Sequence, residues 1–188
     1  MPQLTQEQAR TLLHSTTQQP HLRQHALAVS AAMGAMAEHF GENAEYWQAV
    51  GYLHDYAYEQ YPEEHLQHTR EPLLAAGVDE GAVRAILGHG YELCTDVCPE
   101  TPLEKSLYAV DELTGLIGAT ARMRPTGIMD LEASSVKKKF KDKAFAAKIN
   151  REVIRKGSEM LGMDLGELIS VCISGMRAHA EELGLLGK

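Results

Sequence analysis

The apolar residues of this chain recur every three or four positions, and nowhere do they alternate with polar residues for the length of a strand. Such spacing places side chains on one face of a helix. The clearest run opens at Pro20, which suits a first helical turn, and Gly41 closes it. The sequence therefore predicts an all-α fold. The inward positions of this helix are Leu22, His25 or Ala26, Val29, Met33, Met36 and Phe40.

Further helix signals follow along the chain. Thr5 with Gln8 forms a capping-box pattern before a short first helix, and Asp164 with Glu167 forms another before the last. The helices expected after the first two cover about 44–59, 64–76, 79–87, 103–122, 136–147, 150–161 and 164–183, with a loop over 92–102.

Length and composition fit one globular domain. A chain of 188 residues, 44% of them hydrophobic, is long enough for one full core and short for two. We expect a single domain over 1–188, with its core over about 20–125 and basic helices over about 136–183. No apolar run approaches the roughly 20 residues that cross a bilayer, and the first residues show no export signal. We therefore expect a cytoplasmic protein without membrane contact.

Charge is spread unevenly along the chain. The net charge is −8, yet nine of the 18 basic residues lie between Lys137 and Lys156, where only Asp142 and Glu152 oppose them. The negative total argues against a nucleic-acid polymer as partner. A local basic surface on an acidic protein suits a small anionic ligand.

The three cysteines do not suggest a disulfide framework, because their number is odd. Cys94 and Cys98 could form half of a zinc site, but no second pair of Cys or His follows at zinc-site spacing.

Imidazole nitrogen and carboxylate oxygen together suit Fe, Mn, Zn or Co better than a purely oxygen set, and six such groups can hold two ions. Asp111 is expected on the inward face of its helix with Leu107 and Thr114. An ionised carboxylate there is costly unless a cation or dense hydrogen bonding compensates. The candidate ligands are His25, His54, Asp55, His65, His89 and Asp111. The histidines expected to be solvated surface residues are His14, His21, His39 and His179.

The surrounding segments carry a family resemblance. They are Tyr52-Leu53-His54-Asp55-Tyr56, Tyr61-Pro62-Glu63-Glu64-His65, Ala85-Ile86-Leu87-Gly88-His89 and Leu107-Tyr108-Ala109-Val110-Asp111-Glu112-Leu113-Thr114-Gly115. In their order and context these segments resemble the HDIG-type branch of the HD superfamily of metal-dependent phosphohydrolases, over roughly residues 20–180. The resemblance implies a single-domain HD-type helical bundle.

The resemblance also implies a ligand set. The residues implied to hold a first metal ion are His25, His54, Asp55 and Asp111. His65 and His89 stand where two-metal members have further ligands. The family's third histidine is usually followed by proline, whereas Leu66 follows here and His68 competes with His65, so the sequence is compatible with one ion or two. The implied cofactor is a divalent transition metal (Fe, Mn, Zn, Co or Ni), and Mg is also compatible.

The implied activity is hydrolysis of a nucleotide or another small phosphate ester by metal-activated water, because a bound divalent ion lowers the pKa of its water and neutralises phosphoryl charge. Asp55 would bridge two ions. Glu59, one turn beyond Asp55, stands where related hydrolases place acids that orient water or protonate the leaving group. A solvated glutamate at a helix end explains Glu59 equally well.

A phosphorylated substrate needs positive partners besides the metal. Arginine can grip phosphate through two hydrogen bonds, whereas lysine acts as a flexible point charge. The candidate substrate-binding residues are Arg124, Lys137, Lys138 and Lys139. A solvated helix face explains the lysine run about as well.

Two other functions fit the same pattern. Some HD-fold proteins with this ligand order use two irons and oxygen to cleave C–C or C–P bonds, and iron content with oxygen consumption would identify such a diiron oxygenase. The other alternative is a non-catalytic sensor that binds a nucleotide, although the presence of Glu59 argues against it.

Overall fold

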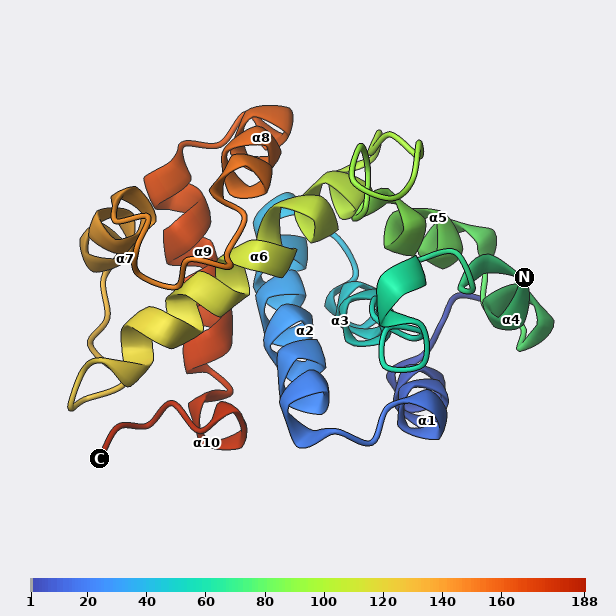
Figure 1. The fold of residues 1–188 in the computed structure, drawn as a ribbon, viewed down its shortest axis with the longest axis horizontal. Coiled ribbons are helices and arrows are strands. Elements are labelled where there is room, and N and C mark those ends of the chain that lie inside the picture. Colours follow the sequence, from blue (N-terminus) through green and yellow to red (C-terminus); the bar gives the residue numbers. More distant parts are fainter. Residues whose placement is uncertain (1) are drawn as a thin grey trace.

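Residues 2–188 are described by a computed structural model in which the regular elements are helices (Figure 1). They are α1 (Gln6–Thr16), α2 (Pro20–Phe40), α3 (Ala44–Leu53), the 3₁₀ helix η1 (Pro62–Glu64), α4 (Arg70–Ala75), α5 (Glu80–Gly88), α6 (Pro102–Arg122), α7 (Ala133–Lys141), α8 (Arg151–Leu161), α9 (Leu165–Arg177) and α10 (Ala180–Leu183). Within these residues there is no strand, and only Tyr91 and Thr95 form an isolated bridge. The predicted all-α fold is confirmed. No helix in the described part is long and apolar enough to cross a bilayer.

Two long helices, α2 and α6, lie at the centre of the molecule and pack against each other (Figure 1). α3 and α9 pack on α2, and α8 packs on α6. A continuous apolar core runs through these contacts and includes Met33 and Met36 of α2, Leu113 and Ile117 of α6, and Ile169 of α9. Burying each such side chain contributes about 1.5–3 kcal/mol relative to leaving it exposed. The α2–α6 pair is therefore a fixed frame for the polar residues that it carries.

Local polar contacts start the first helices where the sequence predicts. The capping box at Thr5 is present at α1. Asp79 caps α5 by accepting the backbone N–H of Ala82 at 3.0 Å. The same buried carboxylate accepts the N–H of Leu4 at 2.8 Å and the hydroxyl of Tyr46 at 2.6 Å. Asp79 therefore ties the N-terminal segment to α3 and α5.

Two of the predicted helices are shorter in the structure. The helix expected over 44–59 stops before His54, whose Nδ1 lies 2.6 Å from the Gly51 carbonyl that a continuing helix would use. The helix expected over 64–76 is replaced by a turn and the short helix α4. Leu66 has a left-handed φ of 68°, which a regular helix does not tolerate.

The C-terminal helices also differ from the prediction. α7 covers Ala133–Lys141, so it starts and ends earlier than the helix expected over 136–147. In the loop that follows α7, the guanidinium of Arg151 binds the carbonyls of Asp142, Phe145 and Ala146. The helix expected over 164–183 breaks near His179 into α9 and α10. The predicted capping box of that helix does not form, since Asp164 caps α9 through one backbone N–H.

Candidate metal centre

Six histidine and aspartate side chains meet between α2, α3, α5 and α6. One comes from α2 and one from the middle of α6, while the others follow α3, η1 and α5 at their C-terminal ends. Their ligand atoms form overlapping groups of three, within each of which all the atoms lie within 4.8 Å of one another. The six are His25, His54, Asp55, His65, His89 and Asp111, so the structure brings together every predicted ligand.

One half of the centre is built around Asp111. Its Oδ1 lies 2.9 Å from His25 Nε2 and 3.1 Å from His54 Nε2. The two imidazole nitrogens are 3.2 Å apart. Asp55 Oδ2 completes this half, at 3.4 Å from His54 Nε2 and 3.7 Å from His25 Nε2. Two imidazoles and two carboxylates therefore converge on one point.

The other half is built around two histidines. His65 Nε2 and His89 Nε2 are 3.1 Å apart. Asp55 Oδ1, the second oxygen of the same carboxylate, lies 3.7 Å from His65 Nε2 and 3.5 Å from His89 Nε2. Each oxygen of Asp55 thus faces a different pair of histidines, which is the position of a carboxylate able to bridge two ions.

Backbone carbonyls orient two of the imidazoles. His54 Nδ1 lies 2.6 Å from the Gly51 carbonyl, and His89 Nδ1 lies 2.5 Å from the Ile86 carbonyl. A carbonyl only accepts, so Nδ1 carries the proton in both rings and the Nε2 lone pair of the neutral ring is directed into the centre. Contacts of this kind fix the tautomer of a metal-binding histidine. Each of these two histidines sits just after the helix end whose carbonyl holds it.

The centre attracts positive charge. Burial opposes ionisation of Asp55 and Asp111, but the surrounding histidines outweigh it and hold the pKa of both carboxyls well below the usual range. Burial likewise opposes protonation of His54, but Asp55 and Asp111 raise its pKa well above the ordinary value. Burial and the nearby His89 lower the pKa of His65 to about 4. The first half thus favours a cation, while His65 offers a neutral imidazole near pH 7.

His68 and Glu59, the other polar candidates near the centre, have partners elsewhere. His68 Nε2 is 2.8 Å from Glu64 and its ring stacks on Tyr61, so His65 alone of the two histidines joins the cluster. Glu59 accepts the backbone N–H groups of Gln18 and Gln19 at 3.0 and 2.8 Å. These contacts tie the Glu59 carboxylate to the segment between α1 and α2, just before α2 begins at Pro20.

The four predicted substrate-binding cations are not brought to the centre. Arg124 donates to Asp130 at 3.1 Å. It lies beyond the C-terminal end of α6, roughly 20 Å along the helix axis from Asp111. Lys139 lies over the ring of Phe145. Within residues 2–188 neither Arg124 nor any of Lys137–Lys139 lines the cavity at the centre.

That cavity has a volume of about 420 Å³ and opens onto five of the six ligands. Sequence reasoning missed three polar residues in its wall, which are Tyr58, Glu112 and His21. Glu112 follows Asp111 directly, and burial together with Asp111 raises the pKa of its carboxyl. Its Oε1 accepts the N–H of Asn150 at 3.2 Å. The place of Glu112 beside an inward-facing aspartate was the signal that could have found it.

No protein-family model, no curated protein and no solved structure matches this chain. The buried histidine and aspartate groups can hold a metal ion. The donor set is four imidazoles and two carboxylates, which suits divalent transition metals.

Proposed function

We propose that this protein is a divalent-metal-dependent phosphohydrolase of the HD type, acting on a small phosphate ester such as a nucleotide. The observation that carries the proposal is the placement of Asp55, whose two oxygens face two separate pairs of histidines. A carboxylate shared in this way is suited to hold two cations side by side, as two-metal phosphoester hydrolases require.

The donor atoms fit divalent ions. The Nε2 atoms of His54 and His89 point inward as acceptors, and the ionised oxygens of Asp55 and Asp111 lie among them. Without a metal ion, a proton on His54 Nε2 offsets part of the negative charge of the two carboxylates, and a bound divalent ion would take the place of that proton. Bound divalent ions would supply Lewis acidity, which activates water and neutralises charge on a phosphoryl oxygen.

The chain itself supplies groups for proton transfer and orientation. Glu112 Oε1 is occupied by the Asn150 N–H, which leaves Oε2 to take up or release a proton at the cavity wall. Tyr58 also lines the cavity, where its ring and the His65 ring pack edge to face. Its hydroxyl can donate a hydrogen bond to a phosphoryl or leaving-group oxygen. We propose these two residues in the role first assigned to Glu59.

The decisive experiment combines metal analysis with turnover. Protein purified without chelator is assayed for Fe, Mn, Zn, Co and Ni, and then for hydrolysis of p-nitrophenyl phosphate, bis-p-nitrophenyl phosphate and a panel of nucleotides. We expect Asp55→Ala to lose its bound metal and to reduce turnover on the order of a thousandfold, because the variant lacks the shared ligand. Asp96→Ala removes an exposed carboxylate from the loop after α5 and serves as the matched control.

Full metal occupancy and unchanged turnover in Asp55→Ala would overturn the proposal. Oxygen consumption by iron-loaded protein, without phosphate release from any ester, would replace it with the diiron oxygenase. Tight nucleotide binding with no turnover under any metal would replace it with a sensor.

A further inference from the structure

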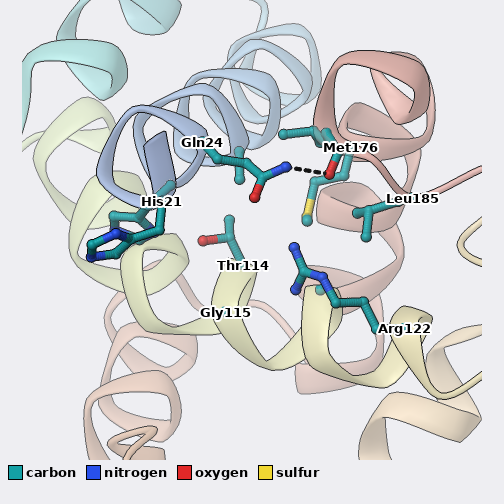
Figure 2. Close-up of a pocket in the computed structure, with 11 residues that line it drawn as sticks. His21, Gln24, Thr114, Gly115, Arg122, Met176 and Leu185 are labelled. Atoms are coloured by element: carbon teal, nitrogen blue, oxygen red, sulfur yellow. Dashed lines mark hydrogen bonds between the residues drawn. The ribbon is translucent and has the colours of Figure 1, made fainter. Parts of the chain in front are cut away.

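A second cavity of about 420 Å³ lies next to the metal centre, between α2, α6 and the chain around α10 (Figure 2). His21 and His25 line both this cavity and the one over the metal centre. The first turns of α2 are thus a wall common to the two. A ligand that occupied both cavities would pass these two histidines.

Arg122 supplies the positive charge of this second cavity. It is the last residue of α6, and Figure 2 shows its guanidinium directed into the cavity. Two residues later, Arg124 is paired with Asp130. Arg122, by contrast, has no carboxylate or carbonyl partner within residues 2–188, and no carboxylate lines the cavity. An unpaired guanidinium in a cavity free of acids is suited to bind an anion.

Gly118 makes room for the Arg122 guanidinium on the surface of α6. A Cβ at Gly118 would lie 3.0 Å from Arg122 Nη1, so the glycine leaves the space that the guanidinium occupies. Gln24 uses its Nε2 to donate to the Leu183 carbonyl at 2.8 Å, which leaves its Oε1 as an acceptor in the cavity (Figure 2). The opposite wall is apolar and contains Met176 and Leu185. The cavity therefore offers one guanidinium that can bind an anionic group, next to a wall that can pack against the apolar part of a ligand.

The arrangement of the two cavities sets the distance between the metal centre and the Arg122 guanidinium. The guanidinium of Arg122 reaches back along α6 to the level of Gly118. From Asp111 to Gly118 the helix rises roughly 10 Å, at about 1.5 Å per residue. An anion on Arg122 and a phosphoryl group at the metal centre would be separated by about this length.

We propose that the second cavity is a substrate subsite in which Arg122 binds a second anionic group. The inference rests on the proposed phosphohydrolase function and narrows its substrate class. The substrate is a phosphate ester that carries a carboxylate or second phosphate roughly 10 Å from the reacting phosphoryl group, joined to it by a largely apolar framework.

The test uses straight-chain alkane bisphosphonates, with phosphorus atoms about 6 to 14 Å apart, bracketing the spacing set by the helix rise. Alkyl monophosphonates of matching length are the reference probes. Binding to metal-loaded protein is measured by calorimetry and by inhibition of p-nitrophenyl phosphate hydrolysis. We expect the bisphosphonate near 10 Å to bind about tenfold more tightly than its monophosphonate partner, as a charge-assisted contact allows.

Arg122→Gln should abolish that advantage and leave monophosphonate binding unchanged. Arg122→Lys should retain part of it, because the charge stays while the planar donor pair is lost. Arg10→Gln is the matched control, since it removes an exposed arginine charge from α1. We expect this control to behave as wild type.

The subsite proposal would be overturned if wild type bound the two probe series with equal affinity. It would also be overturned if Arg122→Gln lost affinity for bisphosphonates and monophosphonates to the same extent. Neither result would count against the phosphohydrolase function. Absence of any phosphonate binding, together with absence of phosphate ester hydrolysis, would instead count against the phosphohydrolase function. Monophosphonate binding therefore distinguishes failure of the subsite proposal from failure of the phosphohydrolase proposal.

Discussion

The metal centre and the basic segment between Lys137 and Lys156 are the two charged features that stand out in the sequence, and the fold treats them in opposite ways. Ligands far apart in the chain converge around Asp55. Cations that are neighbours in the chain disperse toward separate partners. Lys156 pairs with Glu92, and Arg155 pairs with acids of its own helix.

The difference follows from helix geometry. Successive residues on a helix point about 100° apart, so a run of lysines covers most of its circumference. Residues from separate helices meet when each lies on an inward face or at a helix end. Asp111 satisfies the first condition, while His54 and His89 satisfy the second. A shared face or a helix end was therefore a better guide to convergence than proximity in sequence.

Arg151 shows that a charge in the basic segment can have a structural role. Its guanidinium donates to carbonyl oxygens around a loop, at distances of 2.5 to 3.4 Å. The accepting carbonyls belong to Lys139, Phe140, Asp142, Phe145, Ala146 and Ile149. At least one of the basic residues in this segment therefore holds the backbone and does not face a ligand.

Among the tests of this comparison, we expect the largest effect on turnover from variants that separate the two halves of the metal centre. His65→Ala and His89→Ala should each remove one of two metal ions and leave the ion held by His25, His54 and Asp111. Turnover should fall on the order of a hundredfold, about 2.7 kcal/mol of transition-state stabilisation. Elemental analysis and steady-state kinetics on the same preparation give both quantities.

His68→Ala is the matched control for this pair, because it removes a nearby histidine that is bound to Glu64. It should keep both ions and full turnover. One metal per chain in wild type, with all three histidine variants fully active, would reduce the centre to a mononuclear site.

The next effect concerns stability in the basic segment. Arg151→Ala leaves the loop carbonyls without their donor, and we expect the free energy of unfolding to fall by about 2–4 kcal/mol. Arg155→Ala, on the same helix but held by exposed acids, should change stability little. Urea unfolding measures both, and metal content should stay constant in each. Equal losses in the two variants would show that Arg151 is an ordinary surface charge.

The sequence predicted the helical class, the starts of several helices and all six members of the histidine–aspartate centre. The helical class and the helix starts were predicted because helix caps and inward faces are local properties that periodicity records. The choice of the six ligands also depended on the order of segments that resemble HD phosphohydrolases. The subsite residue Arg122 was not predicted, since its role depends on Gly118 and on the chain around α10, which only the tertiary fold brings together. Helical periodicity also does not record the contacts that hold Arg124 and Glu59. Arg124 binds Asp130, and Glu59 binds the backbone just before α2.

The smallest expected effect tests whether the lysine run touches substrate at all. The sequence allowed substrate contact or a solvated helix face, and the residues lining the metal cavity do not include Lys137, Lys138 or Lys139. Their charge acts over a Debye length of about 8 Å near physiological salt, so it is largely screened at greater distances. We therefore expect the triple Gln variant to keep its metal and to change KM less than about twofold at that ionic strength. A larger rise in KM that vanishes at high salt would show instead that these lysines guide the anionic substrate, and would remove the contrast between the two regions.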